Sequence, residues 1–297
     1  MTNNTIKKYI NVNTKFRPFV KGTQEKNTDF IIDLPMPVRN VLSLKLKSFS
    51  APDSVYTFSV SETNNSFEVI TNESKTTVSV LPGKYTPDTL NTLLANVNSQ
   101  INSLGIQLDY DDALQKFRFT GDNISNVELN FDVQNNYIYD TFGWVIGFNK
   151  SYYSNDAAYE RPYPDPACPK NSGNRGGLTV IGTEKYYLAD SPVALPNTSL
   201  YYLLYVDDFL NNIEDSFYEG CFPSNNNIRN VLAKISTKYA ADNNTFYETD
   251  TDASFERVYS GHVSLNRLHI KLFDDNNKIV DFNNANYTFL LELISAR

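Results

Sequence analysis

The sequence predicts a mainly β protein, a single eight-stranded jelly roll (a β-sandwich) with an inserted α+β domain. Aromatic residues are abundant, with 20 Tyr and 19 Phe in 297 residues, and these side chains favour strands. Short apolar stretches with period-two alternation recur along the chain, and Asn-rich turns separate them. Two strong strands precede residue 50 and six follow residue 177, which together make the eight strands of a jelly roll.

The first two strands of the predicted jelly roll lie in residues 28–50. Residues 28–34 (TDFIIDL) read as one strand, and Pro35 and Pro37 are expected to end it. Residues 41–48 (VLSLKLKS) alternate between leucine and polar residues. This pattern predicts a half-buried strand in which Leu42, Leu44 and Leu46 face the core.

Residues 51–150 are predicted to form the inserted domain. Its expected strands are 55–60, 66–71, 76–81, a hairpin of 106–111 with 116–121, and 127–133. One helix interrupts them, because Thr86 can cap it, Pro87 suits its first position and Asp88 complements its dipole. Gly105 is placed to end it. Its apolar stripe is expected to cover a small sheet and comprises Leu90, Leu93, Leu94, Val97, Ile101 and Leu104.

Residues 151–177 are rich in Pro and Gly and predict a surface loop that connects the insert to the remaining strands. Residues 178–297 are expected to supply jelly-roll strands 3–8, at 178–188, 199–209, 230–238, 254–263, 265–273 and 287–295. In the fifth, Leu268 and its apolar neighbours share one face and Arg267, His269 and Lys271 share the other. The alternative organisation is two independent β-domains in series.

The charge distribution argues against non-specific nucleic-acid binding by the whole surface, because the formal net charge is -8. Residues 1–27, in contrast, hold six basic side chains and one acid. Such an N-terminal arm is expected to dock on an acidic partner or a neighbouring copy, and the alternative is a merely solvated terminus. No apolar run is long enough to span a membrane, and no secretory signal is visible. The two cysteines, Cys168 and Cys221, have no metal-binding spacing, which favours a reducing compartment.

The sequence predicts no catalytic, cofactor-binding or metal-binding residues. Residues 82–86 (PGKYT) resemble part of a phosphate-binding loop, but Val78 occupies the position of its first Gly and Tyr85 that of its Ser or Thr. The spacing of His262 and His269 is not that of a ligand pair. The Asp-rich stretches 109–115 and 274–278 are expected to be turns.

The most acidic group of residues is Asp207 and Asp208, with Glu214 and Asp215 nearby. Paired carboxylates can bind a metal ion or act as acid and base, so a metal-dependent hydrolase is one alternative function. The other interpretation, which we favour, is the end of a strand that enters a polar loop.

Three segments taken together resemble a known family. They are residues 9–52 (YINVNTKFRP to SFSAP), residues 81–98 (LPGKYTPDTLNTLLANVN) and residues 261–293 (GHVSLNRLHIKLFDDNNKIVDFNNANYTFLLEL), with Ile146-Gly147-Phe148 as a further match. Their order is similar to that in the penton (vertex) and minor capsid proteins of nucleocytoplasmic large DNA viruses and their virophages. The chain departs from the family pattern in its opening residues and at Asn277, where a Gly is usual.

The resemblance implies a structural capsid protein without enzymatic activity, most simply the penton, which forms homopentamers at icosahedral five-fold vertices. It implies contacts with the neighbouring major capsid protein, an insert that projects outward, and a location in the virion after assembly in the host cytoplasm. It implies no cofactor and no specific nucleic acid. Two alternatives stay open at this point: a minor capsid protein that cements the major capsomers, and a glycan-binding or receptor-binding β-module.

Overall fold

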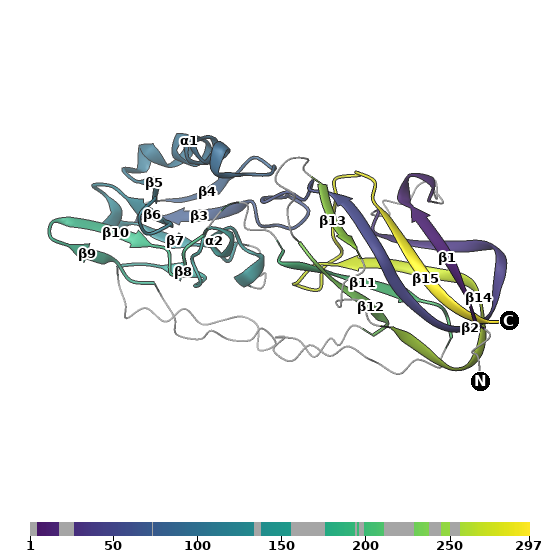
Figure 1. Cartoon of the computed structure of the whole chain (residues 1–297). Helices are drawn as coiled ribbons and strands as arrows, with labels where there is room; N and C mark the ends of the chain where they lie inside the picture. The colour runs from purple at the N-terminus through teal and green to yellow at the C-terminus, as the bar shows by residue number, and fades with distance from the viewer. Residues whose placement is uncertain are drawn as a thin grey trace. The chain divides into compact units, whose positions relative to one another are not determined.

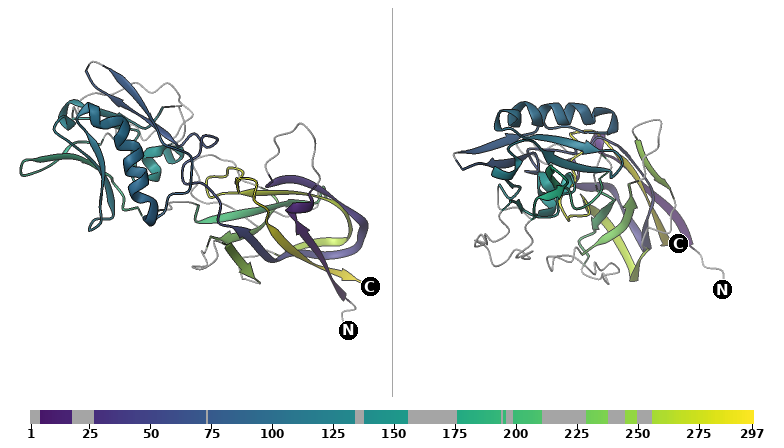
Figure 2. Two further views of the ribbon diagram at one scale, coloured as in Figure 1. Left: turned by 90° about the horizontal axis from the view of Figure 1, so that it is seen from above. Right: turned by 90° about the vertical axis from the view of Figure 1, so that its left-hand side faces the viewer.

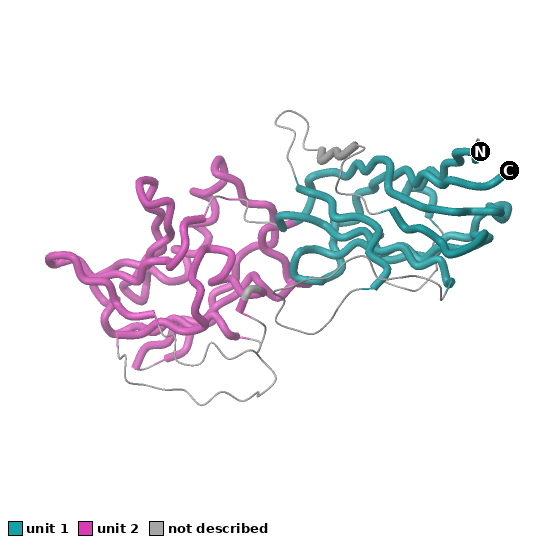
Figure 3. The backbone as a smooth tube through the Cα atoms, turned by 60° about the horizontal axis from the view of Figure 1, so that its bottom comes forward, with its two compact units in different colours: residues 1–55, 199–297 teal, residues 56–198 magenta. Residues whose placement is uncertain are grey.

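The computed structural model describes residues 5–17, 27–72, 74–133, 138–155, 176–193, 195, 199–210, 229–237, 245–249 and 256–297. It is mainly β, as predicted, with antiparallel sheets and few helices. The chain divides into two compact units: unit 1 comprises residues 1–55 and 199–297, and unit 2 comprises residues 56–198 (Figure 3). Cys168, Cys221, Glu214, Asp215 and most of the predicted 151–177 loop lie outside the described residues.

Unit 1 is a seven-stranded antiparallel sheet (Figure 1). Its strands are β1 (Thr5–Asn13), β2 (Asp29–Pro52), β11 (Tyr201–Asp207), β12 (Val231–Ser236), β13 (Thr245–Thr249), β14 (Arg257–Phe273) and β15 (Thr288–Ala296). The order is β1-β15-β2-β14-β11-β12, and β13 also pairs with β2. Val12 on β1 and Ile235 on β12, at opposite ends of this order, belong to one buried apolar cluster. One apolar core therefore extends from β1 to β12, and the eight-stranded jelly roll remains a prediction.

The prediction that Pro35 and Pro37 end the first strand is wrong, because β2 continues through both of them. The pairing of β2 with β14 shifts register on either side of this stretch, so the prolines lie in a bulge. A bulge leaves backbone N–H groups outside the ladder, which is where a strand tolerates Pro. The pairing of β2 with β15 also shifts register, next to Val41. Leu42, predicted to face the core, is therefore not buried, and Val41 and Leu44 are buried instead.

Residues 5–13 of the basic N-terminal arm are part of the chain's own sheet, and the docking of the arm on an acidic partner or a neighbouring copy stays a prediction. These residues form β1, which pairs with β15 of the same chain from Thr5↔Ala296 to Asn13↔Thr288. Val12 on β1 is buried in the core of unit 1, and Ile10 packs against this core. Alternating Ile6, Ile10 and Val12 are the sequence signal that identifies a strand in this basic segment.

Unit 2 contains two four-stranded sheets around an aromatic core. Their orders are β5-β6-β10-β9 and β4-β3-β7-β8. The strands are β3 (Ser66–Ile70), β4 (Lys75–Ser79), β5 (Gln107–Asp111), β6 (Lys116–Thr120), β7 (Glu128–Asn130), β8 (Tyr152–Tyr153), β9 (Thr179–Ile181) and β10 (Glu184–Leu188). The rings of Phe67 and Phe142 stack with their centroids 4.7 Å apart in this core. Phe142 comes from the short helix α2 (Phe142–Val145).

The predicted helix is present as α1 (Leu90–Ile101), between the 3-10 turns η2 (Pro87–Thr89) and η3 (Asn102–Leu104). Thr86 is the N-cap of η2, and its backbone N–H donates to Thr89 Oγ1 at 2.8 Å. Gly105 ends the element with φ +75°, a conformation that favours Gly, and a Cβ there would lie 2.9 Å from Asn123 Cβ. All six residues of the predicted apolar stripe belong to or pack against the core of unit 2.

Helix α1 contacts the edge strands of both sheets, β4 and β5 (Figure 2). The Asn98 side-chain amide accepts from Leu108 N at 2.7 Å and donates to Leu108 O at 2.9 Å. Gln100 does the same for Ser79, at 3.1 Å and 2.9 Å. Each carboxamide bonds to the edge strand as the peptide group of a further strand would. The helix therefore satisfies backbone hydrogen-bonding groups at the strand edges and also covers the core.

Further strand assignments need correction. Residues 254–263 and 265–273, predicted as two strands, form the single strand β14. Residues 55–60 form no strand, because Thr57 and Phe58 both donate to Gly83 O in an irregular turn. Residues 178–188, predicted in the jelly roll, form β9 and β10, and β10 pairs with β6 in unit 2. Unit 2 therefore spans 56–198 rather than 51–150, and it is inserted into unit 1 rather than following it in series.

Candidate functional site

Asp208 is the carboxylate that the metal-site alternative requires, and the structure places it in a buried ion pair. It follows β11, and its Oδ2 lies 3.1 Å from Arg257 Nη1. Tyr259 donates its hydroxyl to the same oxygen at 2.7 Å, and Leu210 N donates to Oδ1 at 3.0 Å. Asp208 and Arg257 side chains are 0% and 6% exposed. Both carboxylate oxygens are therefore used within the fold.

Asp207 does not join Asp208 as a second catalytic carboxylate. Neighbouring residues of an extended chain point to opposite sides, and Asp208 takes the buried side. Asp207 Oδ1 instead accepts from Phe209 N at 2.8 Å, which closes the turn at the strand end. Burial is the main cause that raises the pKa of Tyr259, and the hydrogen bond to Asp208 raises it as well. The hydroxyl therefore keeps its proton and donates to Asp208. The arrangement is that of a strand end tied to its neighbours.

His269 lies on the polar outer face of β14, as predicted. Its Nε2 is 2.7 Å from Asp29 Oδ1, and Lys271 Nζ is 3.5 Å from Asp29 Oδ2. On the same pair of strands Arg267 makes a two-pronged contact with Asp33, at 2.5 and 3.2 Å. Polar contacts thus cross the ladder between β2 and β14 on this face, while Leu268, Ile270 and Leu272 are buried on the other face.

The segment 82–86 has no phosphate-loop geometry. Tyr85 is 6% exposed, and its hydroxyl donates to Leu81 O at 2.9 Å. Gly83 forms a bridge with Phe58, and the backbone N–H of Tyr85 donates to Thr57 Oγ1. The segment therefore fixes the approach to α1, and its backbone amides at 83 and 85 are already occupied.

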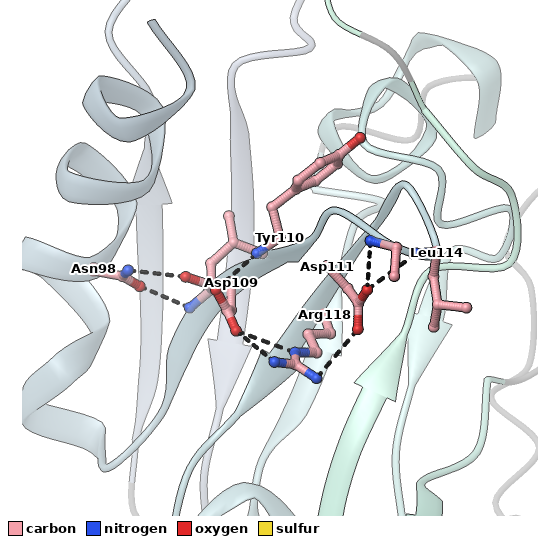
Figure 4. Close-up of polar contacts among 8 residues, drawn as sticks. Asn98, Asp109, Tyr110, Asp111, Leu114 and Arg118 are labelled. Carbon is pink, nitrogen blue, oxygen red and sulfur yellow. Dashed lines mark hydrogen bonds and ion pairs between the residues drawn. The ribbon is translucent and has the colours of Figure 1, made fainter. Parts of the chain in front are cut away.

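The acidic stretch 109–115 forms the predicted turn (Figure 4). Arg118 on β6 binds Asp109 Oδ2 at 2.8 Å and lies 3.6 Å from Asp111. Asp111 Oδ1 accepts from the backbone N–H groups of Ala113 and Leu114, both at 3.0 Å. Stretch 274–278 is also a turn, in which Asp274 Oδ1 accepts from Asn276 N and Lys278 N. Asp109 and Asp111 therefore meet at the Arg118 guanidinium, and Asp274 closes its own turn.

Among the described residues, no group of three or more His, Cys, Asp or Glu side chains is arranged to hold a metal ion. No helix in the described part of the chain has the length and hydropathy to cross a membrane.

Glu292 on β15 is a buried carboxylate that sequence reasoning missed. It faces away from the core, yet its side chain is only 2% exposed. Lys7 Nζ lies 3.2 Å from it, Lys45 Nζ 3.7 Å, and Tyr9 donates its hydroxyl at 3.3 Å. Burial raises the pKa of Glu292, whereas the hydrogen bond and charge of Lys7 and the charge of Lys45 lower it. The lowering is the larger effect, so the pKa of Glu292 lies below its ordinary value. The sequence signal for this buried acid is a single Glu within the apolar stretch FLLELI.

A scan of the chain against models of known protein families finds no match, and a search of curated proteins finds none either. Two solved structures are similar over nearly the whole chain. The cryo-EM structure of the Sputnik virophage contains a chain that is 13% identical, with a TM-score of 0.44, over 99% of this chain and 98% of that chain. The crystal structure of the mavirus penton protein is 10% identical, with a TM-score of 0.41, over 98% of this chain and 99% of that chain.

Proposed function

We propose that this chain is a structural protein of a viral capsid and that it forms the penton, a ring of five copies at an icosahedral five-fold vertex. The observation that carries the proposal is the order of the three segments 9–52, 81–98 and 261–293, together with the places that they take in the fold. The first and last contribute strands β1, β2, β14 and β15, which pair with one another in unit 1. The middle one contains the start of α1 in unit 2.

The architecture suits a shell component that also carries an independent module. All seven strands that the structure describes in the sheet of unit 1 come from outside residues 56–198. Unit 2 has a separate apolar core of its own. We propose that unit 1 makes the contacts with neighbouring copies and with the major capsid protein, and that unit 2 projects from the shell.

The division of charge supports an outward position for unit 2. Unit 1 holds 17 Lys and Arg against 18 Asp and Glu, whereas unit 2 holds 9 against 16. Nearly all of the net charge of -8 therefore belongs to unit 2. An acidic module is repelled by packaged nucleic acid and is better placed on the outside of a shell.

A structural role accounts for how the acidic and histidine residues are used. Asp208 is bound by Arg257, Tyr259 and a backbone amide, and His269 lies within a row of polar contacts across strands. These contacts hold strands together. The same residues would have to be released from them before they could act on a substrate.

The test is a pair of cryo-EM reconstructions of virus particles, one set containing this chain and one set lacking it. The penton proposal predicts difference density around every five-fold axis. Difference density between the major capsomers would instead assign the chain to the minor capsid proteins. Identical reconstructions, in particles shown by mass spectrometry to differ in this chain, would overturn the capsid role.

A further inference from the structure

Strand β1 ends the seven-stranded sheet of unit 1 and is unusually regular for an edge strand. Its nine residues pair with β15 in one unbroken register, without a bulge or a Pro. Natural proteins commonly shorten, bulge or cover such edges, because exposed backbone groups there can pair with another chain. β1 shows neither the shortening nor the bulge.

The hydrogen-bonding direction of each β1 residue follows from one contact. Thr14 N donates to Tyr287 O at 3.0 Å, and the pair Thr14 and Tyr287 continues the register of β1 with β15. Backbone groups of an antiparallel strand point alternately to either side. Residues 6, 8, 10 and 12 therefore bond to β15, whereas the N–H and C=O groups of Lys7, Tyr9 and Asn11 point to the other edge of β1. None of the described strands pairs with this edge, which we call the open edge.

The two lysines that would ordinarily protect this edge are bound to the protein's own sheet. Lys7 Nζ binds Glu292, and Lys8 Nζ donates to Arg39 O at 3.4 Å. Apolar surface flanks the same edge, since Tyr9 is 53% exposed and Ile6 39%. A row of backbone donors and acceptors with adjacent apolar side chains matches the chemistry of another extended backbone.

The opposite end of the same sheet is different. β12 has six residues, its pairing with β11 contains a bulge, and most of its side chains are buried. Of the two strands at the ends of the order β1-β15-β2-β14-β11-β12, β1 is the longer and the more exposed.

We propose that the open edge of β1 is the subunit contact of the ring and receives an extended strand from a second copy of this chain. Charge complementarity favours a second copy as the occupant. Residues 5–17 hold four basic side chains and no acid, whereas the rest of the chain holds 22 basic side chains against 34 acidic. This inference rests on the proposed ring, which requires a contact between two different surfaces that closes on itself.

Hydrogen–deuterium exchange of the assembled full-length protein, read at single residues, tests the inference without any substitution. Amides of residues 8, 10 and 12 bond to β15 and exchange slowly whether or not the edge is covered. If the edge is paired, the amides of Lys7, Tyr9 and Asn11 exchange as slowly as these neighbours. An alternating pattern within the ring, fast at 7, 9 and 11 and slow at 8, 10 and 12, overturns the inference.

A matched pair of variants tests the same contact by its effect on assembly. Asn11→Pro removes an N–H that faces the open edge, at a position where an edge strand accepts Pro, and Asn11→Ala keeps the N–H. We expect Asn11→Pro to raise the concentration at which rings dissociate by roughly tenfold or more, and Asn11→Ala to leave it unchanged. The masses are read by mass photometry, and circular dichroism checks that both variants keep the wild-type fold.

The outcomes separate this inference from the proposed function. Rings that persist in a folded Asn11→Pro protein show that the edge of β1 is not the contact, and the penton proposal stands. If Asn11→Pro does not fold, the exchange pattern of the wild-type ring decides alone. A wild-type protein that forms no ring in solution and none at the vertex overturns both.

Discussion

At the residue scale, Asp208 and Arg257 are predicted to matter more for stability than the other ion pairs of unit 1. The pair is almost fully buried, whereas the side chains of Asp33 and Arg267 are 69% and 53% exposed. Removing one partner of a buried pair leaves an uncompensated charge in the interior, while exposed pairs contribute little.

We therefore expect Arg257→Met to destabilise unit 1 by about 3–5 kcal/mol, and the control Arg267→Met to have a much smaller effect. Scanning calorimetry of the full chain measures both variants. Equal effects for the two variants would contradict the structural role given to Asp208.

Glu292 should make the stability of unit 1 sensitive to acid. Its pKa is lowered in the folded protein, so the stabilisation is present above the unfolded value of about 4.3 and is lost as the pH falls through the folded value. Glu292→Gln should be less stable than the wild type by about 1 kcal/mol at pH 7.

The difference between wild type and Glu292→Gln should shrink as the pH is lowered from about 4.3, because the variant lacks this titration. Melting temperatures of the wild type and of Glu292→Gln, measured from pH 7 to pH 3, test this prediction. A difference that stays constant over this range would show that Glu292 is not the group responsible.

The sequence could identify individual residues only where their role is local. Thr86, Pro87 and Gly105 act within one helix and its turns, and their roles were predictable from spacing alone. The partners of Asp208 and Glu292 lie 49 and 285 residues away along the chain, at Arg257 and Lys7. No local pattern reports such pairings, so Asp207–Asp208 could be read as an acidic site and the Glu292 cluster was missed.

At the element scale, α1 shows why a mainly β protein contains one well-formed helix. Its apolar stripe packs on the core of unit 2, and its Asn98 and Gln100 amides bond to the backbone of β5 and β4. The apolar stripe explains the packing, while the two amides explain how the exposed backbone at the strand edges is satisfied.

We predict that Asn98→Ala destabilises unit 2 by about 1–3 kcal/mol, because two hydrogen bonds to the backbone of Leu108 are lost. Asn91→Ala is the control, since Asn91 is exposed on the same helix and Ala is the better helix former. The thermal transition of unit 2 should fall for the first variant and stay or rise slightly for the second. A fall of similar size in both would refute the role of the Asn98 amide.

Strand prediction succeeded where alternation was regular and failed where backbone irregularity decided the outcome. The hairpin of β5 and β6 and the buried face of β14 follow their sequence patterns. β2 does not stop at Pro35, because a bulge removes the need for its missing N–H. The sequence also could not predict which strands pair with each other. For example, β10 pairs with β6 in unit 2 and not with a strand of unit 1.

At the scale of the whole molecule, the two separate apolar cores predict that unit 2 folds by itself. A fragment of residues 56–198 should give a cooperative thermal transition and the near-ultraviolet signal of a packed aromatic core. The fragment 51–150, which lacks β9 and β10, serves as the control and should be markedly less stable. Equal stability of the two fragments would restore the domain boundary predicted from the sequence.

The central claim, that this chain builds a five-fold vertex, is tested most directly by the mass of the purified full-length protein in solution. One chain has a mass of 33.7 kDa. Mass photometry across a dilution series should show a discrete species at five times this value, in equilibrium with smaller species. A monomer at every concentration, together with the absence of the chain from the vertices of particles, would contradict the account.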